Sequence, residues 1–311
     1  MVQKNYKPVR QKIRPTVSII TINYKQAIVT NQLLASLQKL TWPELDVIVV
    51  DNNSGQESTD KIDTGYSNTS LIINSENLGF AGGNNVGIKA SSGEYILLLN
   101  NDTEVIPGLI EPMIELLEKD SRIGAVSPKI KFYHHPDLIQ YAGFTPMHPL
   151  TLRMRAHGYK EQDQGQHDQG GETSFAHGCA MMIPRRVVSQ VGMMPEEYFL
   201  YYEEHDWSTA IRRQGYKIYY EPRSLVYHKE SVSVQGESLL KTYFLNRNRI
   251  LYMRRNHPYF QRVVATLFLL LISIPKNMIT YLVNQQGNHL KVYCQALIWN
   301  LSNPSKHGIS R

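Results

Sequence analysis

Four short apolar runs in the first hundred residues constrain the fold of this chain more than any other feature. They cover residues 17–22, 47–50, 71–73 and 95–99 and consist largely of Val, Ile and Leu. Between the first two, Val and Leu recur at three- and four-residue spacing over residues 29–40, which indicates a helix. Continuous apolar runs that alternate with helices are typical of a parallel sheet buried on both faces. The sequence therefore predicts an α/β fold with a mostly parallel central sheet flanked by helices.

Polar side chains follow each of these apolar runs. They are Asn23 and Tyr24, Asp51 to Ser54, Asn77, and Asn100 to Asp102. Ligands of open α/β sheets bind outside the carboxyl ends of the strands, so this edge is the predicted binding face. Residues 77–87 are rich in glycine but lack both the G-x-G-x-x-G pattern of dinucleotide sites and the lysine of a P-loop. Both familiar phosphate-binding signatures are therefore excluded, and a tight turn needing positive φ would explain the glycines by itself.

The charge of the chain is unevenly distributed. Of a net +6, residues 1–14 contribute five Lys or Arg and no acid, and residues 212–262 contribute eleven Lys or Arg against three Glu. Such segments attract the phosphates of nucleotides, anionic lipids or nucleic acids. Cys179 and Cys294 give no disulfide framework, and the N-terminus lacks the apolar stretch of a signal peptide, which favours the reducing cytosol. Residues 1–14 are predicted to be a basic flexible tail.

An ordered set of motifs resembles glycosyltransferase family 2. The set consists of residues 18–24, 49–54, 77–84, 99–102, 178–183, 198–206 and 227–228. It follows the order of the family from residue 16 to about 235, and it is most similar to bacterial rhamnosyltransferase-like members. The resemblance implies the GT-A fold for a catalytic domain at residues 15–235, followed by a C-terminal helical extension at residues 236–311.

The resemblance also implies a nucleotide-sugar site at the strand ends. Asp51 would accept a hydrogen bond from an N–H of a pyrimidine base, and Thr21, Asn23 and Tyr24 would line the same pocket. The main chain at Asn77 and the glycines after it would approach the donor closely. Further donor contacts are assigned to Asn53, Gly82, Asn100 and Asn101. A turn or a helix N-cap is the alternative explanation for Asp51 and the residues that follow it.

Asn100-Asn101-Asp102 stands at the place of the D-x-D metal motif of the family. Asp102 supplies one carboxylate, whereas Asn100 is a neutral amide, so the metal site is weaker than in the family. The role left for Asn100 is a contact to the ribose or phosphate of the donor. Mg²⁺ and Mn²⁺ prefer oxygen ligands and bind phosphates through one or two carboxylates, so either ion is the expected cofactor. His228 would complete the metal shell, with a hydrogen-bonded structural histidine as the alternative. The alternative for residues 100–103 is the N-cap of a helix that begins near Pro107.

Three acids compete for the role of catalytic base: Glu203, Glu204 and Asp206. Inverting transfer needs a base for the proton of the acceptor hydroxyl, and a carboxylate in a partly apolar pocket suits this because desolvation raises its pKa. The family carries Glu-Asp here with the second acid as base, so the resemblance favours Glu204, whose side chain is one methylene longer. In a helix, Glu203 and Asp206 would share a face while Glu204 points elsewhere. An acidic first turn favoured by the helix dipole is the alternative for two of the three.

Two later regions are candidates for contact with the acceptor and a membrane. Residues 132–173 are rich in His, Gln, Gly and Pro and are predicted to be a flexible polar loop; the family implies acceptor recognition there and near residues 175–179. Residues 263–274 are intensely apolar, but they end at Pro275 and are shorter than the roughly twenty residues of a spanning helix. The five arginines between residues 247 and 262 suit an anionic membrane interface, with a buried core helix as the alternative.

Together these features predict an inverting glycosyltransferase with a UDP- or dTDP-linked donor, dTDP-rhamnose being one candidate. Its acceptor would be a hydroxyl of a glycan or lipid-linked intermediate of cell-surface polysaccharide synthesis, at the cytoplasmic face of the cell membrane. A sugar nucleotidyltransferase is one alternative, but it would carry a glycine-rich loop after the first strand, where residues 23–26 contain no glycine. A non-catalytic binder of anionic membranes or nucleic acid is another, but it would not explain Glu203-Glu204 or the acids at strand ends. No nucleic-acid partner is expected.

Overall fold

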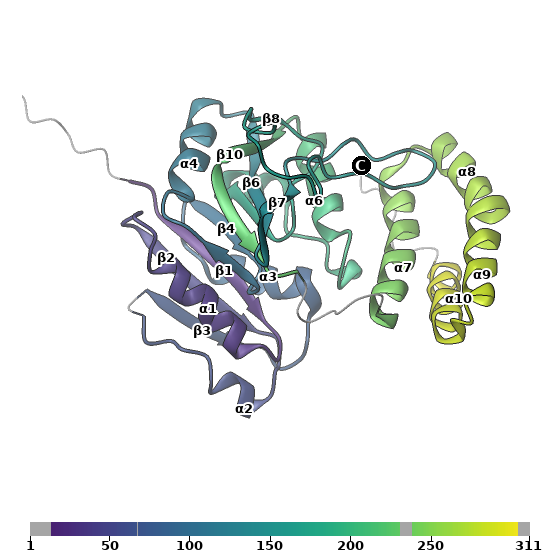
Figure 1. Cartoon of the computed structure of the whole chain (residues 1–311), viewed down its shortest axis with the longest axis horizontal. Coiled ribbons are helices and arrows are strands. Elements are labelled where there is room, and N and C mark those ends of the chain that lie inside the picture. The colour runs from purple at the N-terminus through teal and green to yellow at the C-terminus, as the bar shows by residue number, and fades with distance from the viewer. Residues whose placement is uncertain (1–13, 67, 231–237, 304–311) are drawn as a thin grey trace, which may run out of the picture.

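The computed structural model describes residues 14–66, 68–230 and 238–303. Within them, ten strands form a sheet in the order β3-β2-β1-β4-β9-β6-β10-β5, with β7 beside β6 and β8 beside β10 (Figure 1). The strands are β1 (Val17–Asn23), β2 (Leu45–Asp51), β3 (Thr69–Ile73), β4 (Tyr95–Leu99), β5 (Thr103–Val105), β6 (Ile123–Phe132), β7 (His135–Tyr141), β8 (Gly171–Glu172), β9 (Ala180–Pro184) and β10 (Lys217–His228). The four apolar runs become β1 to β4 and pair in parallel, which confirms the predicted α/β fold. The sheet is mixed farther along, because β9 lies antiparallel between β4 and β6.

Helices cover both faces of the sheet and continue beyond it. They are α1 (Ala27–Leu37), α2 (Gln56–Thr59), α3 (Gly79–Ala90), α4 (Ile110–Lys119), α5 (Arg185–Val191), α6 (Glu203–Arg213), α7 (Leu239–Asn256), α8 (Tyr259–Phe268), α9 (Ile274–Val283) and α10 (Gly287–Ser302). Successive side chains of a strand point to opposite faces, so two apolar cores form. Ile19 packs in one with Leu33 of α1, and its neighbour Ile20 packs in the other with Ile88 of α3.

The glycines after β3 serve the packing of α3. Gly79 begins the helix at φ +70, and a Cβ there would collide with the main chain of Phe199. A Cβ on Gly83 would lie 2.9 Å from Asn52 Nδ2, and one on Gly87 would collide with Ile20 of β1. The Cβ of Leu78 fills the space at Gly82, 2.6 Å from where a Cβ would stand. Side chains of the protein therefore occupy the space that these glycines leave, and contact between Gly82 and a donor stays a prediction.

The C-terminal helices α7 to α10 lie at one end of the molecule, beyond α6 (Figure 1). The arginines of α7 face inward. Arg247 and Arg249 are each 7% exposed. Arg254 donates to the main-chain oxygens of Asn300 in α10 and of Asn303, which follows α10. Arg255 Nε donates to Asp206 Oδ2 of α6 at 2.5 Å. The prediction that these four arginines face a membrane is therefore wrong. Their partners are far away in the sequence, so charge spacing alone could not identify them.

The apolar segment before Pro275 belongs to a longer helix than predicted. Helices α8 and α9 join through a π-helical turn at Leu269–Ser273, so that Tyr259–Val283 is one helical stretch of 25 residues. Proline removes a backbone donor from a helix, and a π turn just before it accommodates that loss. By length and composition alone the stretch could cross a bilayer, which corrects the prediction of a run that is too short. Only 11% of its most apolar window is buried, so a core helix does not describe it either.

Residues 132–173 are partly ordered by the sheet. They contain β7 and β8, and buried Lys129 of β6 holds the segment through Asp163 at 3.2 Å and through Asp168. The expectation of a flexible polar loop is therefore wrong where β7 and β8 form. The predicted domain boundary at residues 235–236 and the predicted tail, apart from Arg14, lie outside the described residues.

Candidate active site

The carboxyl ends of β1 and β2 form a buried polar network. Asn23 pairs with Asp51 in the sheet register, and Asn23 Nδ2 donates to Asp51 Oδ1 at 2.6 Å. Asp51 also accepts hydrogen bonds from the main-chain N–H and the hydroxyl of Ser54 and from Thr59 Oγ1. A carboxylate offers about four acceptor positions, so the protein itself uses all of them. The turn interpretation of this segment therefore matches the geometry, and a base contact by Asp51 stays a prediction that needs one of these bonds to be displaced.

The other predicted donor residues surround this network at different depths. Thr21 is fully buried, and within the described residues its Oγ1 has no hydrogen-bond partner. Tyr24 is 39% exposed, so its ring is accessible for stacking. Asn101 Nδ2 donates at 3.1 Å to the hydroxyl of Thr30, which in turn donates to Asn23 Oδ1 at 2.8 Å. The structure therefore brings Thr21, Asn23, Asp51 and Asn101 together.

Asn53 and Asn77 lie at the margin of this site and shape turns. Asn53 adopts φ +59, and its Nδ2 donates to the main-chain oxygen of Ser75 at 3.0 Å. Asn77 Oδ1 accepts the N–H of Gly79 at 2.9 Å and so begins α3. Asn52, one of the polar residues at the predicted binding face without an assigned role, donates from its Nδ2 to the oxygen of Gly79 at 2.8 Å. Its position directly after a strand end was the signal for that face.

Asp102 connects β4 to β5 and lies beside the end of β10. Helix α4 starts at Ile110 with Leu109 as its N-cap, so the prediction that residues 100–103 cap this helix is wrong. Thr103 instead pairs with His228 of β10, which places Asp102 Oδ1 3.2 Å from His228 Nε2. Both residues are buried, at 4% and 7% exposed.

The ring of His228 is oriented so that its Nε2 faces Asp102. Its Nδ1 lies 2.8 Å from Gln140 Oε1, and in the tautomer that donates to this oxygen the lone pair of Nε2 faces Asp102. Within the described residues, neither His228 Nε2 nor the buried Oδ1 of Asn100 has a hydrogen-bond partner. Those residues contain no cluster of three or more His, Cys, Asp or Glu side chains, so Asp102 and His228 stand as a pair.

The three acidic candidates occupy the first turn of α6 and differ sharply in their surroundings. Asp206 is a structural anchor: it accepts from the hydroxyl of Tyr198 at 2.7 Å and from Arg255 Nε at 2.5 Å. Glu203 is buried at 2% exposed, and burial together with the neighbouring Glu204 carboxylate raises its pKa well above the usual value. Burial thus favours the protonated form of Glu203, and Asp206 is already engaged by two donors.

Glu204 stands apart from the other two acids, as the helical spacing predicted. Its Oε1 lies 3.0 Å from His205 Nδ1, and a Cβ on Gly178 would lie only 3.4 Å from its carboxyl carbon. Burial opposes ionisation, but His205, a backbone hydrogen bond and the nearby His177 together outweigh it, so the pKa of Glu204 is lowered and its carboxylate form is favoured. This direction is opposite to the raised pKa that desolvation alone suggested, because the histidine partner could not be inferred from spacing.

His177 joins the two halves of the site. Its ring centroid lies 6.5 Å from that of His228, and its ring stacks on Phe144 at 5.6 Å. Nδ1 accepts the N–H of Cys179 at 3.2 Å, and burial lowers the pKa of His177 to about 3, so the ring is neutral. Sequence analysis named residues 175–179 as a region for the acceptor but gave no role to His177 or His205, because isolated histidines carry no spacing signal.

Comparisons with known proteins agree with this architecture. Residues 18–192 match the profile described as glycosyl transferase family 2. The chain is 27% identical over 248 residues to the low-salt glycan biosynthesis hexosyltransferase Agl10 of Haloferax volcanii, covering 78% of this chain and 77% of the relative. It is 23% identical to an N-acetylglucosaminyl-diphospho-decaprenol L-rhamnosyltransferase of Mycobacterium tuberculosis, covering 69% and 76%.

Two solved structures share the fold. The mannosyltransferase PcManGT from Pyrobaculum calidifontis, determined with GDP-Man and Mn²⁺, superposes with a TM-score of 0.57 at 16% identity, over 94% of this chain and 76% of that one. GalNAc-T7, determined with UDP, GalNAc and Mn²⁺, superposes with a TM-score of 0.57 at 15% identity, over 69% and 43%. The predicted GT-A fold is thereby confirmed.

Proposed function

Because the chain belongs to glycosyl transferase family 2, we propose that this hexosyltransferase-type enzyme is inverting and uses a nucleoside-diphosphate sugar as donor and a glycan or lipid-linked hydroxyl as acceptor. One observation carries the proposal. The Asp102–His228 pair lies at the strand ends, and His177, whose ring centroid lies 6.5 Å from that of His228, also interacts electrostatically with Glu204, the acid of the α6 turn that Arg255 does not hold. A leaving-group site and a base on opposite sides of a reacting centre are what inverting transfer requires.

The Asp102–His228 pair fits a divalent cation. Two neighbouring ligands of an octahedral ion at about 2.1 Å are roughly 3 Å apart, and these two atoms are 3.2 Å apart. A carboxylate with an imidazole suits Mn²⁺ better than Mg²⁺. When bound, such an ion would neutralise charge on the diphosphate leaving group. Asp102 and His228 would hold it, with Gln140 orienting the imidazole.

Glu204 is the proposed base. It is ionised, and glycine at position 178 leaves the space in front of its carboxyl free of a side chain. The acceptor hydroxyl would transfer its proton to a Glu204 oxygen as the hydroxyl oxygen attacks the anomeric carbon. His205, 3.0 Å from Oε1, holds the carboxylate in place. Thr21, Asn23 and Tyr24 would receive a pyrimidine nucleotide in a pocket that Asp51 orders, and a dTDP- or UDP-linked hexose, including rhamnose, is the proposed donor.

We further propose that the enzyme works at the cytoplasmic face of the cell membrane, in synthesis of cell-envelope polysaccharide. The stretch Tyr259–Val283 exposes apolar side chains that include Leu271 at 73%, Ile279 at 59% and Val283 at 73%. Exposed apolar surface of this extent is typical of membrane contact. The name of the mycobacterial relative includes a lipid diphosphate, which supports an acceptor held in a membrane.

The test is a two-stage assay. Nucleotide sugars are first screened by thermal shift, because a ligand that binds the folded state raises the unfolding temperature. Release of UDP or dTDP is then measured with Mn²⁺, and the anomeric configuration of the product is read by NMR. Retention of configuration would refute the inverting mechanism, and no turnover of any donor would refute the function.

A further inference from the structure

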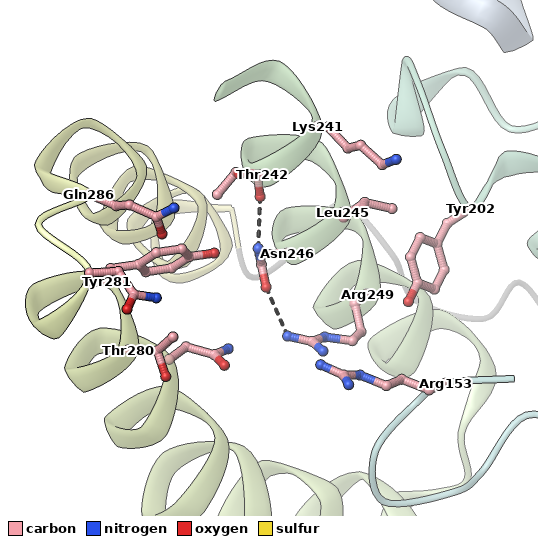
Figure 2. Close-up of a pocket in the computed structure, with 12 residues that line it drawn as sticks. Arg153, Tyr202, Lys241, Thr242, Leu245, Asn246, Arg249, Thr280, Tyr281 and Gln286 are labelled. Atoms are coloured by element: carbon pink, nitrogen blue, oxygen red, sulfur yellow. Dashed lines mark hydrogen bonds between the residues drawn. The ribbon is translucent and has the colours of Figure 1, made fainter. Parts of the chain in front are cut away.

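A cavity of about 590 Å³ lies between α7, α9 and the segment that carries Arg153. Figure 2 shows the guanidinium groups of Arg153 and Arg249 side by side at its wall, with Tyr202 next to them. Lys241 of the first turn of α7 also lines it. Among the described residues, the cavity wall contains these three cations and no acidic side chain; amides, hydroxyls and one leucine complete it.

Arg249 is built into this wall. Its side chain is 7% exposed, its terminal nitrogen donates to Asn246 Oδ1 at 2.8 Å, and Asn246 is itself held by the main-chain oxygen of Thr242 (Figure 2). Within the described residues its Nε is buried without a hydrogen-bond partner. A buried guanidinium beside a second one is unfavourable unless an anion compensates them. Phosphate groups do so well, because several oxygens accept the forked donors of arginine.

The cavity also adjoins the proposed base. Tyr202 is the residue before α6, and its hydroxyl donates to the main-chain oxygen of Leu152 at 3.2 Å. The ring of Tyr202 lies 5.4 Å from the ring of His205, whose Nδ1 is 3.0 Å from Glu204 Oε1. An anion in the cavity is thus separated from the catalytic carboxylate by two side chains.

On its other side the cavity meets the exposed apolar helix. Asn277 and Thr280 of α9 line the cavity, while Ile279 and Leu282 of the same helix are 59% and 61% exposed. A lipid whose chain lies against this apolar face would bring its head group to the cationic wall. The cavity therefore lies between the apolar face of α9, which could hold a lipid chain, and Tyr202, which leads to the proposed base Glu204.

From this arrangement we propose that the cavity binds the diphosphate of a lipid-linked acceptor and so presents the attached sugar to Glu204. The inference rests on the proposed function and adds the chemical class of its acceptor, a sugar diphosphate ester of a long-chain lipid. Arg249 and Arg153 would each hold phosphate oxygens, and Lys241 would contribute its charge at the rim. The diphosphate stays intact, because transfer occurs at the sugar hydroxyl.

The test uses geranyl diphosphate as probe and geraniol as its uncharged match. Binding is measured by calorimetry in EDTA, so that a metal in the donor site does not contribute. We expect geranyl diphosphate to bind and geraniol not to bind. Arg153→Gln and Arg249→Gln should each weaken binding by about tenfold or more, since each removes a charge-assisted hydrogen bond. Lys291→Gln removes an exposed cation of α10 outside the cavity and should leave the affinity unchanged.

Donor turnover separates the two proposals. Hydrolysis of the nucleotide sugar should proceed in the wild type and be unaltered in Lys291→Gln, an exposed position outside the cavity. Donor turnover without any binding of geranyl diphosphate overturns this inference and leaves the function standing. Equal affinity in wild type and both arginine variants also overturns it. So does a loss of binding to phosphatidylglycerol vesicles in these variants with unchanged affinity for geranyl diphosphate, because that result assigns the cavity to phospholipid head groups.

Discussion

Replacing Glu204 by Gln tests the proposed chemistry most directly. Gln keeps the shape of the side chain and its contact with His205, but it cannot accept a proton at the position 3.0 Å from Nδ1. A general base contributes ~10²–10⁴ in rate, or about 2.7–5.4 kcal/mol of barrier, so kcat should fall by that factor. The affinity for the donor should stay close to wild type, because the donor network at Asp51 is on other elements. Steady-state kinetics with a working donor and acceptor measures both.

The neighbouring acids are matched controls for this variant. Glu203→Gln places a neutral group where burial and the Glu204 carboxylate favour the protonated acid, so kcat should change little. Asp206→Asn should act through stability: it removes the shorter of two ion pairs of Arg255, and breaking a buried pair costs about 3–5 kcal/mol, here less because Arg255 is partly exposed and keeps Glu197 at 3.5 Å. Urea unfolding should detect this loss, while kcat of the folded fraction is retained.

Glu204→Asp tests the extra methylene relative to the family pattern. The structure places the Glu204 carboxylate against Gly178 and His205, so the shorter acid would withdraw from both. We expect it to be much slower than wild type but faster than Gln. A Glu204→Gln enzyme that transfers sugar at the wild-type rate would refute the assignment and leave no ionised, uncommitted acid in the α6 turn.

Three further outcomes are expected. Asp102→Asn should abolish most metal-dependent turnover without unfolding the protein, and EDTA should do the same to wild type; unchanged activity in both would remove the metal from the mechanism. In the unfolded chain Glu203 loses its proton above the ordinary pKa of about 4.5, whereas in the folded protein its raised pKa retains the proton to higher pH. The contribution of Glu203 to the free energy of unfolding therefore falls as the pH rises. Glu203→Gln should therefore weaken the decline of unfolding free energy as the pH rises above about 4.5, and an identical decline would contradict the shift. Leu271→Gln with Val283→Gln should reduce binding to lipid vesicles, whereas full binding would show that this face is not the contact.

The sequence predicted those parts of the molecule in which local pattern and tertiary position coincide. Buried strands such as β1 and β4 are continuous apolar runs, and their polar ends meet because parallel strands end at one edge. The pair Asp102 and His228 was also foreseen, but only through the resemblance, since 126 residues separate them. Partners of buried groups could not be foreseen. The choice of Arg255 by Asp206 depends on how α6 and α7 cross, and the contact of Glu204 with its chain neighbour His205 depends on the rotamers of the two side chains.

That crossing ties α7 to the segment that carries the proposed base. Asp206 follows Glu204 by two residues, and it is fixed to α7 through Arg255 and to Tyr198 through a hydroxyl. Asn248 of α7 donates to the main-chain oxygens of Tyr198, Leu200 and Tyr201, in the segment where Phe199, Tyr201 and Tyr202 have positive φ. Such strained backbone persists only when its surroundings hold it. Since this segment leads directly into the turn that bears Glu204, α7 supports the position of the proposed base, and other side chains of α7 line the cationic cavity. If both proposals hold, acceptor binding and proton transfer depend on the same helix.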